Sequence, residues 1–240
     1  MKSSVKDSAQ SNKVHAVIMV AAHSEWQAVK NHFNEPSIKQ SPFGESFSTI
    51  IDGHRCVFLQ GGWGKVSAAA ATQYAIDHWQ PQLILNLGTC GGFEGRNKVG
   101  EIVLADETII YDIHERMGDP EAARRFYASH IDLSSLRQPL PNNIRVGLIA
   151  SADEDIDPAL VQQLTGRYNA LAADWESGAI AWVAHRNRTR VLILRVVSDL
   201  VGSQTGELYG EGDFNSRSLE VMPPLLAALP DWLERAFQSE

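Results

Sequence analysis

The sequence predicts an α/β protein with a largely parallel sheet, and three observations support this fold class. Short apolar runs rich in Val and Ile alternate with segments of helical pattern, as in β-α-β units. The length of 240 residues fits one large α/β domain that can bury a sizeable core. The composition, 44% hydrophobic and 21% charged, is ordinary for a globular chain.

Strands are predicted where short apolar runs meet turn residues. These runs are 14–22, 47–51, 56–60, 83–87, 101–104, 145–151, 170–174 and 191–197. The last, "VLILRVV", is the most continuous strand pattern in the chain. Glycine-rich turns are expected at 61–64 and at Gly88–Gly92.

Helices are predicted at 25–32, 65–79, 158–165, 177–187 and 218–237. Ser24 offers an N-cap for the first helix, and Asp157 begins the third. Pro223 and Pro224 are expected to kink the last one. Residues 1–13 are polar and indicate a disordered tail, and residues 14–240 contain no linker, so we expect a single domain there.

Charge and cysteine usage exclude several classes of function. A net charge of −8 argues against a nucleic-acid partner. Cys56 and Cys90 fit no metal-ligand pattern and indicate a reducing compartment without a structural disulfide. The chain has no apolar run long enough to span a membrane and no secretory signal at its start. We therefore expect a cytoplasmic protein with no cofactor, no metal and no membrane partner.

Candidate functional residues follow six of the apolar runs, because ligands of open α/β sheets gather beyond the carboxyl ends of the strands. These positions hold His23-Ser24-Glu25, Gly61–Lys65, Gly88–Gly92, Ser151–Asp155, Asp174–Ser177 and Ser198-Asp199. Most of them offer a carboxylate, and the other two are glycine-rich. This combination suits a small polar ligand such as a sugar or a phosphate, although tight strand-to-helix turns explain the glycines equally well.

Three carboxylates allow both a catalytic and a structural interpretation. Asp199 ends a strongly hydrophobic strand, where a half-buried acid can keep its proton near neutral pH. The alternative for Asp199 is the N-cap of a following turn. Glu176 precedes an Ala-rich helix, where a first-turn Glu also favours the helix dipole. Glu25 could equally be a surface residue of its helix.

The motifs in combination resemble the nucleoside phosphorylase and nucleosidase family. They are "NLGTCGGF…KVGEIVLADE", "ADWESGAIAWVAH" and "LRVVSDLV", extended by "GGWGKVSAAAATQYAID" and "VGLIASADEDI". The likeness covers roughly 14–222 and is strongest to the 5'-methylthioadenosine/S-adenosylhomocysteine nucleosidases. It implies a three-layer α/β/α architecture with a central mixed, largely parallel twisted sheet. It also implies a homodimer, with Trp63 and the segment 111–126 as interface candidates.

The resemblance implies roles residue by residue. Asp199 matches the general acid that protonates purine N7. Glu176 matches the carboxylate that holds the ribose 2'- and 3'-hydroxyls, and Glu25 matches the residue that orients the attacking water. The further substrate-binding residues implied are Thr89, Ser198, Trp63, Asp155, Ile156, Trp175 and Tyr209. Trp175 stands where the family usually has a Met. Tyr209 is either a lid residue over the base or a plain surface tyrosine.

The base-binding segment departs from the family pattern. Members that act on adenine place an aromatic residue near the position of Asp155 and Ile156. A carboxylate there can accept a hydrogen bond from an exocyclic amine but cannot stack, so Trp63 and Trp175 become the candidates for an aromatic face. The segment 111–126 also differs from the usual 5'-pocket loop. Methylthioadenosine, adenosylhomocysteine and an aminofutalosine-like nucleoside therefore remain open as substrates.

Hydrolysis is favoured over phosphorolysis. Phosphate-using members carry an arginine at the start of an R-x-G-T/S-C-G motif, and this chain has Asn86 at that position. They carry a second arginine after the first strand, where this chain has none. Both arginines would bind the phosphate dianion. Glu25 would also repel phosphate. Arg116 or Arg195 could still supply the missing charge, so a phosphorylase stays the alternative. A non-catalytic nucleoside-binding protein is the third possibility, and it has no need for all three carboxylates.

Overall fold

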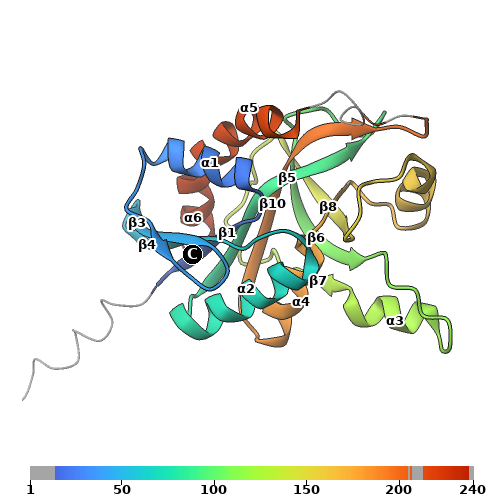
Figure 1. The fold of residues 1–240 in the computed structure, drawn as a ribbon, viewed down its shortest axis with the longest axis horizontal. Coiled ribbons are helices and arrows are strands. Elements are labelled where there is room, and N and C mark those ends of the chain that lie inside the picture. The colour runs from blue at the N-terminus through green and yellow to red at the C-terminus, as the bar shows by residue number, and fades with distance from the viewer. Residues whose placement is uncertain (1–13, 205, 207–212, 238–240) are drawn as a thin grey trace, which may run out of the picture.

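The computed structural model describes residues 14–204, 206 and 213–237, in which strands and helices alternate along much of the chain (Figure 1). The strands are β1 (Ala16–Val20), β2 (Lys39–Gln40), β3 (Glu45–Ile51), β4 (His54–Gln60), β5 (Leu83–Phe93), β6 (Ile102–Ile110), β7 (Ser129–His130), β8 (Ile144–Ser151), β9 (Ala172–Asp174) and β10 (Arg190–Val201). The helices are α1 (His23–His32), α2 (Gly64–Trp79), α3 (Pro120–Tyr127), α4 (Ser177–Arg186), α5 (Phe214–Ala227) and α6 (Leu229–Phe237). Within these ranges, no helix is long and apolar enough to cross a bilayer.

The strands of the described residues form one mixed sheet, which confirms the predicted α/β class. In one half of the sheet β1 lies parallel to β4 on one side and to β5 on the other. Strands β3 and β2 extend this half through antiparallel pairing at its edge. Strands β2 and β7 have two residues each, which is too short for a periodic pattern, and we did not predict them. We also did not predict the short helix α3, although Asp119 and Pro120 mark its start.

Helices cover both faces of this half of the sheet (Figure 1). Side chains alternate along a strand, so Ile18 and Val20 pack into a cluster with α1, α5 and α6. Val17 and Met19 point to the opposite face and pack against α2 and α4. Here the chain has the predicted three layers.

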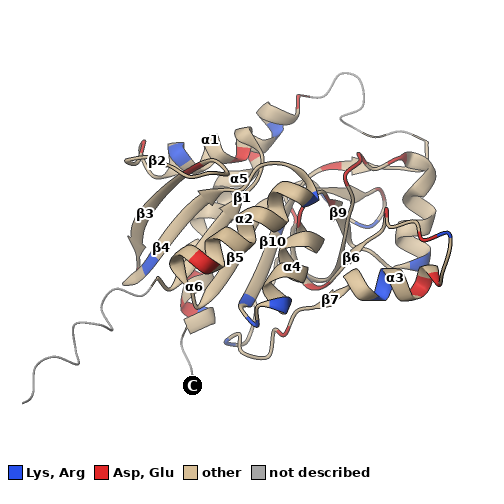
Figure 2. Ribbon diagram, turned by 60° about the horizontal axis from the view of Figure 1, so that its bottom comes forward, with Lys and Arg blue, Asp and Glu red and all other residues tan. Residues whose placement is uncertain are grey.

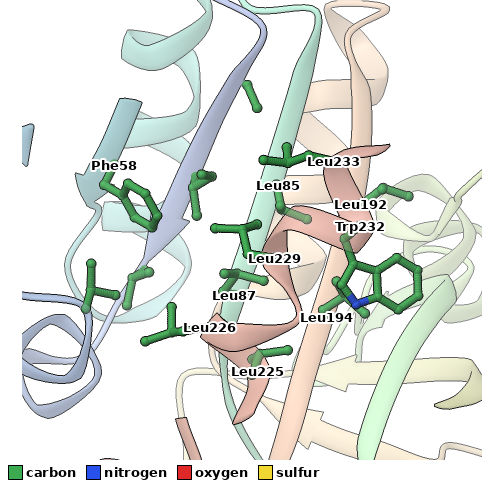
Figure 3. Packing of buried hydrophobic residues seen from close by; sticks show 14 of the residues in the cluster. Phe58, Leu85, Leu87, Leu192, Leu194, Leu225, Leu226, Leu229, Trp232 and Leu233 are labelled. Atoms are coloured by element: carbon green, nitrogen blue, oxygen red, sulfur yellow. The ribbon is translucent and has the colours of Figure 1, made fainter. Parts of the chain in front are cut away.

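The C-terminal helices provide the largest block of this core (Figure 3). Their residues Leu225, Leu226, Leu229, Trp232 and Leu233 pack with Leu85, Leu87, Leu192 and Leu194 of β5 and β10. The single kinked helix predicted at 218–237 is two helices. Helix α5 runs through both Pro223 and Pro224, and the break falls at Ala228. The predicted helix 158–165 is likewise replaced by a 3-10 turn at Pro158–Leu160 and a π-helical turn at Gln163–Arg167.

The sheet does not stay open, which corrects the simple three-layer prediction. Strand β5 pairs with β10, β10 with β6, β6 with β8, β8 with β9, and β9 again with β5, so these strands close into a barrel. Closure is possible because β5 serves two sets of neighbours: it pairs with β1 over Leu83–Asn86 and with β9 at Gly91–Gly92. A register shift between Val197 and Asp199 bends β10 in the same region.

The glycine-rich turn predicted at Gly88–Gly92 is wrong, because β5 continues through it to Phe93. These glycines serve close packing. A Cβ at Gly88 would lie 2.3 Å from Arg195 Nη1, and one at Gly91 would lie 2.4 Å from Ile156 Cδ1. Strand β10 also runs past its predicted end at Val197 to Val201. Residues that we expected on loops therefore lie on paired strands, which hold side chains more firmly.

Gly178 tests the close contact between α4 and the barrel. A Cβ there would lie 2.8 Å from Ile110 Cγ1 and 3.2 Å from the Ile109 carbonyl oxygen, whereas nothing lies within 4 Å of one at Gly166. We expect Gly178→Ala to lower the free energy of unfolding by about 1–3 kcal/mol through overpacking. Gly166→Ala, the matched control, should leave it unchanged or raise it by about 0.5–1 kcal/mol. Urea denaturation measures both, and a Gly178→Ala protein as stable as the parent would show that α4 packs less tightly.

Candidate active site

A cavity of about 470 Å³ opens among β5, β9, β10 and the start of α1. This size suits a small-molecule ligand. Its lining includes every predicted site residue that the structure describes: Glu25, Trp63, Thr89, Asp155, Ile156, Trp175, Glu176, Ser198 and Asp199. Tyr209 lies outside the described residues. The structure thus brings the predicted residues together, while their roles remain predictions.

Glu25 is buried in the first turn of α1 and is not a surface residue. The helix begins one residue before the predicted cap Ser24, with Ala22 as its N-cap. This start directs Glu25 inward, where Oε2 accepts a hydrogen bond from Ala22 N at 3.0 Å. Oε1 accepts from Thr89 N at 2.6 Å and from Thr89 Oγ1 at 2.7 Å. The carboxylate is therefore fixed to the middle of β5.

Glu176 is the N-cap residue of α4, but its side chain makes no cap hydrogen bond. Oε1 accepts a hydrogen bond from Gly64 N at 3.1 Å, and Oε2 lies 3.4 Å from Arg195 Nη2. Burial raises the pKa of Glu176 to about 8, Arg195 opposes that shift, and Asp174 and Glu25 add to it. The structural interpretation of Glu176 as a simple first-turn residue does not hold.

Arg195 lies inside β10 at 1% exposure and joins the acidic groups. Its Nε lies 2.8 Å from Asp174 Oδ2. Its Nη2 donates to Asn86 Oδ1 at 2.8 Å, and its Nη1 donates to the Thr89 carbonyl oxygen at 3.3 Å. Burial alone would lower the pKa of Arg195, but Asp174, Glu176 and Glu25 outweigh it and raise that pKa. The guanidinium is thus a permanent cation within a ring of acceptors.

Sequence reasoning gave Asp174 no role and considered Arg195 only as a possible phosphate ligand. The signal was an arginine inside the apolar run "VLILRVV". An arginine that is buried in a strand needs carboxylate partners. Asp174 serves as the main partner, and Ser151 Oγ donates to its Oδ1 at 2.6 Å.

Asp199 lies within β10, opposite Gly91 of β5, and is partly buried. Ser198 Oγ lies 2.6 Å from Asp199 Oδ1 and 3.2 Å from the Cys90 carbonyl oxygen. Asp199 sits in the strand and faces the cavity, so it is not the N-cap of a turn. Its partner Gly91 lies on the same strand as Thr89, the residue that holds Glu25.

The remaining wall is acidic and aromatic. Asp155 is exposed, Ile156 is buried, and Trp175 is partly buried. Trp63 is 63% exposed although it lines the cavity. Figure 2 shows acidic residues in red on the ribbon around β9. No Lys or Arg belongs to the cavity lining as far as the structure describes it, and Arg116 is an exposed loop residue elsewhere.

Comparison with known proteins identifies the family. The sequence profile of the Phosphorylase superfamily matches residues 15–220. The chain belongs to the phosphorylase superfamily. This membership confirms the resemblance seen in the motifs.

Several relatives in this superfamily are nucleosidases. The 5'-methylthioadenosine/S-adenosylhomocysteine nucleosidase of Halalkalibacterium halodurans is 30% identical over 81% of this chain and 89% of its own length. The Bacillus subtilis nucleosidase of the same name is 28% identical over 78% and 87%.

Solved structures of such nucleosidases share the fold. The Campylobacter jejuni enzyme matches with a TM-score of 0.75 at 20% identity, over 92% of this chain and 99% of that one. The Streptococcus pneumoniae enzyme with the transition-state inhibitor MT-ImmA gives 0.74 at 22% identity, over the same shares.

The pH dependence of stability tests the burial of Glu176. Its pKa of about 8 in the folded protein exceeds the ordinary 4.5, so between these values the folded state holds more protons than the unfolded state. The contribution of Glu176 to the free energy of unfolding therefore falls as pH rises, by up to about 1.4 kcal/mol per pH unit. Glu176→Gln has no titrating group at this position. Its free energy of unfolding should therefore increase relative to that of the parent from about pH 5 to about pH 8.

Urea denaturation across this pH range measures the difference. Glu94→Gln, at an exposed position, is the control and should follow the parent. A constant offset between Glu176→Gln and the parent at every pH would contradict the raised pKa.

Proposed function

We propose that this protein is a nucleosidase that hydrolyses the N-glycosidic bond of purine nucleosides of the 5'-methylthioadenosine/S-adenosylhomocysteine type. The observation that carries the proposal is that one cavity gathers Glu25, Glu176 and Asp199. The names of the relatives support it. The chemistry of the bond explains why three carboxylates at separate places are useful.

Asp199 is proposed as the general acid. The bond breaks through an oxocarbenium-like state in which the leaving purine is a poor anion, so a proton delivered to N7 helps departure. Asp199 pairs with Gly91, which packs against Ile156, and all three line the cavity, so we place the base beside them. Ser198 Oγ, at 2.6 Å from its Oδ1, fixes the orientation of the acid.

Glu176 is proposed to hold the ribose hydroxyls. Its two oxygens are fixed from opposite sides by the Gly64 N–H and by Arg195. At this place a carboxyl group can hydrogen-bond to the ribose hydroxyls and orient the sugar ring, and its ionised form favours the positive charge that develops there. Trp175, adjacent in sequence and also in the cavity wall, supplies an apolar surface for the sugar.

Glu25 is proposed to orient the attacking water. Its carboxylate is held by Ala22 and Thr89, 2% exposed and facing the cavity. A phosphate dianion at this place would meet a carboxylate instead of a cation. The buried cation Arg195 is already shared between Asp174 and Glu176. Water is therefore the nucleophile that fits the charges of the site.

Base release from a nucleoside panel tests the proposal. The panel holds methylthioadenosine, adenosylhomocysteine, adenosine, inosine and an aminofutalosine-type nucleoside, in buffer without phosphate. We expect free base from at least one of them, and Asp199→Asn should slow its release by about 10²–10⁴-fold.

Asp132→Asn is the matched control. Asp132 is exposed and accepts a hydrogen bond from Ser134 N outside the cavity, so its rate should equal that of the parent. No release from any nucleoside, or an Asp199→Asn protein as fast as the parent, would refute the proposal.

A further inference from the structure

The start of α2 lies against the site and has no cap of its own. Its N-cap residue, Trp63, makes no side-chain hydrogen bond to the first turn, so the free N–H groups need other acceptors. Gly64 N donates to Glu176 Oε1 at 3.1 Å, and Lys65 N donates to Asp153 Oδ1 at 2.7 Å. Two N–H groups of the first turn thus have different acceptors: Glu176, which is proposed to hold the ribose, and Asp153, which follows β8.

Asp153 belongs to a small charged network behind the cavity. Lys65 Nζ pairs with Asp112 and lies 3.5 Å from Asp153 Oδ2. Asp153 N in turn donates to Asp112 Oδ2 at 3.1 Å. These contacts fasten together the segments that follow β4, β6 and β8. Asp153 itself is not part of the cavity wall in the described portion of the chain.

Gly64 permits this arrangement. Its φ is +78°, and a Cβ there would lie 2.8 Å from Asp153 Oδ1. Only glycine adopts this conformation easily and lets a carboxylate approach the backbone so closely. Asp153 holds the neighbouring Lys65 N–H, so its contact with the turn bears on whether the Gly64 N–H points toward Glu176.

We propose that Asp153 is a positioning residue: by capping the first turn of α2 from a distant loop, it keeps the Gly64 N–H on Glu176. The inference rests on the proposed function only for the role of Glu176 toward the ribose. The contact itself can be tested without substrate. Burial raises the pKa of Glu176, and the Gly64 N–H opposes that shift, so losing the contact must leave a trace in the titration of Glu176.

The test compares Asp153→Asn and Asp153→Ala with the control Asp157→Asn. Asp157 lies in the same loop, accepts a hydrogen bond from Ala159 N at 2.8 Å and does not line the cavity. The Glu176 carboxyl is titrated by ¹³C NMR in the ligand-free protein and assigned by its absence from Glu176→Gln. We expect its midpoint to move to higher pH in Asp153→Ala. In Asp153→Asn the side-chain oxygen can still accept from Lys65 N, so the midpoint should not rise there, and it should stay in place in the control.

The sign of the change decides the outcome. Removing a nearby negative charge would by itself lower the pKa of Glu176, whereas losing the Gly64 hydrogen bond raises it. Asp153→Asn removes the charge and keeps the acceptor, so it isolates the charge effect. A midpoint in Asp153→Ala that is no higher than in the parent and in Asp153→Asn overturns the proposal.

A double-mutant cycle on base release provides the second readout. Asp153→Ala should lower kcat/KM by about ten-fold or more, mainly through KM, because the ribose is held less accurately. The same change should add little in a Glu176→Gln background, since both substitutions affect one contact. Fully additive losses overturn the proposal. If the parent releases base from no nucleoside, the proposed function fails, while the NMR midpoint still decides the role of Asp153.

Discussion

The buried guanidinium of Arg195 is the charge on which the site depends. It sits inside a central strand and contacts both Asp174 and Glu176. Taking ions out of water costs several kcal/mol each, and the cost is recovered only when geometry and hydrogen bonding are good. Asn86 and the Thr89 carbonyl oxygen take up further donors of the guanidinium. Gly88 is needed because any side chain there would occupy its space.

This single cation allows several acids to share a small buried volume. Without it, Glu25, Asp174 and Glu176 would repel one another beside the cavity. Because Arg195 is committed to these carboxylates, it is not offered to a phosphate. Under the proposed function, the same interaction that holds the acids together also disfavours phosphate as the nucleophile. Glu176 Oε2 faces the guanidinium, whereas Oε1 accepts a hydrogen bond from the Gly64 N–H. Asp153 is proposed to hold that N–H in place.

Barrel closure brings Asp199 and Glu25, the proposed acid and the proposed water-orienting residue, to one cavity. Strands β5 and β10 run parallel and in register over most of their length. Thr89 on β5 fixes Glu25, and β10 carries Asp199, the proposed acid. The glycines of β5 keep the surface between them open. A site carried on paired strands needs little reorganisation when a ligand binds.

The sequence predicted much of this molecule, because apolar runs and their flanking residues are local signals. The alternation of strands and helices and the gathering of Glu25, Glu176 and Asp199 followed from runs such as "VLILRVV". Barrel closure did not follow, since it depends on pairing between β9 and β5, which lie far apart in the chain. Gly88–Gly92 was misjudged because glycine serves both turns and close packing. The hydrogen bonds from Gly64 N to Glu176 and from Lys65 N to Asp153 join residues that lie far apart in the sequence. No local sequence pattern predicts such contacts.

The central claim is that water completes the reaction because Arg195, the cation buried beside the cavity, serves carboxylates. The most direct measurement is the sugar product formed from methylthioadenosine in excess phosphate, followed by ³¹P NMR together with base release. We expect free sugar and no new phosphate-ester resonance. A sugar 1-phosphate that forms one for one with free base would contradict the claim.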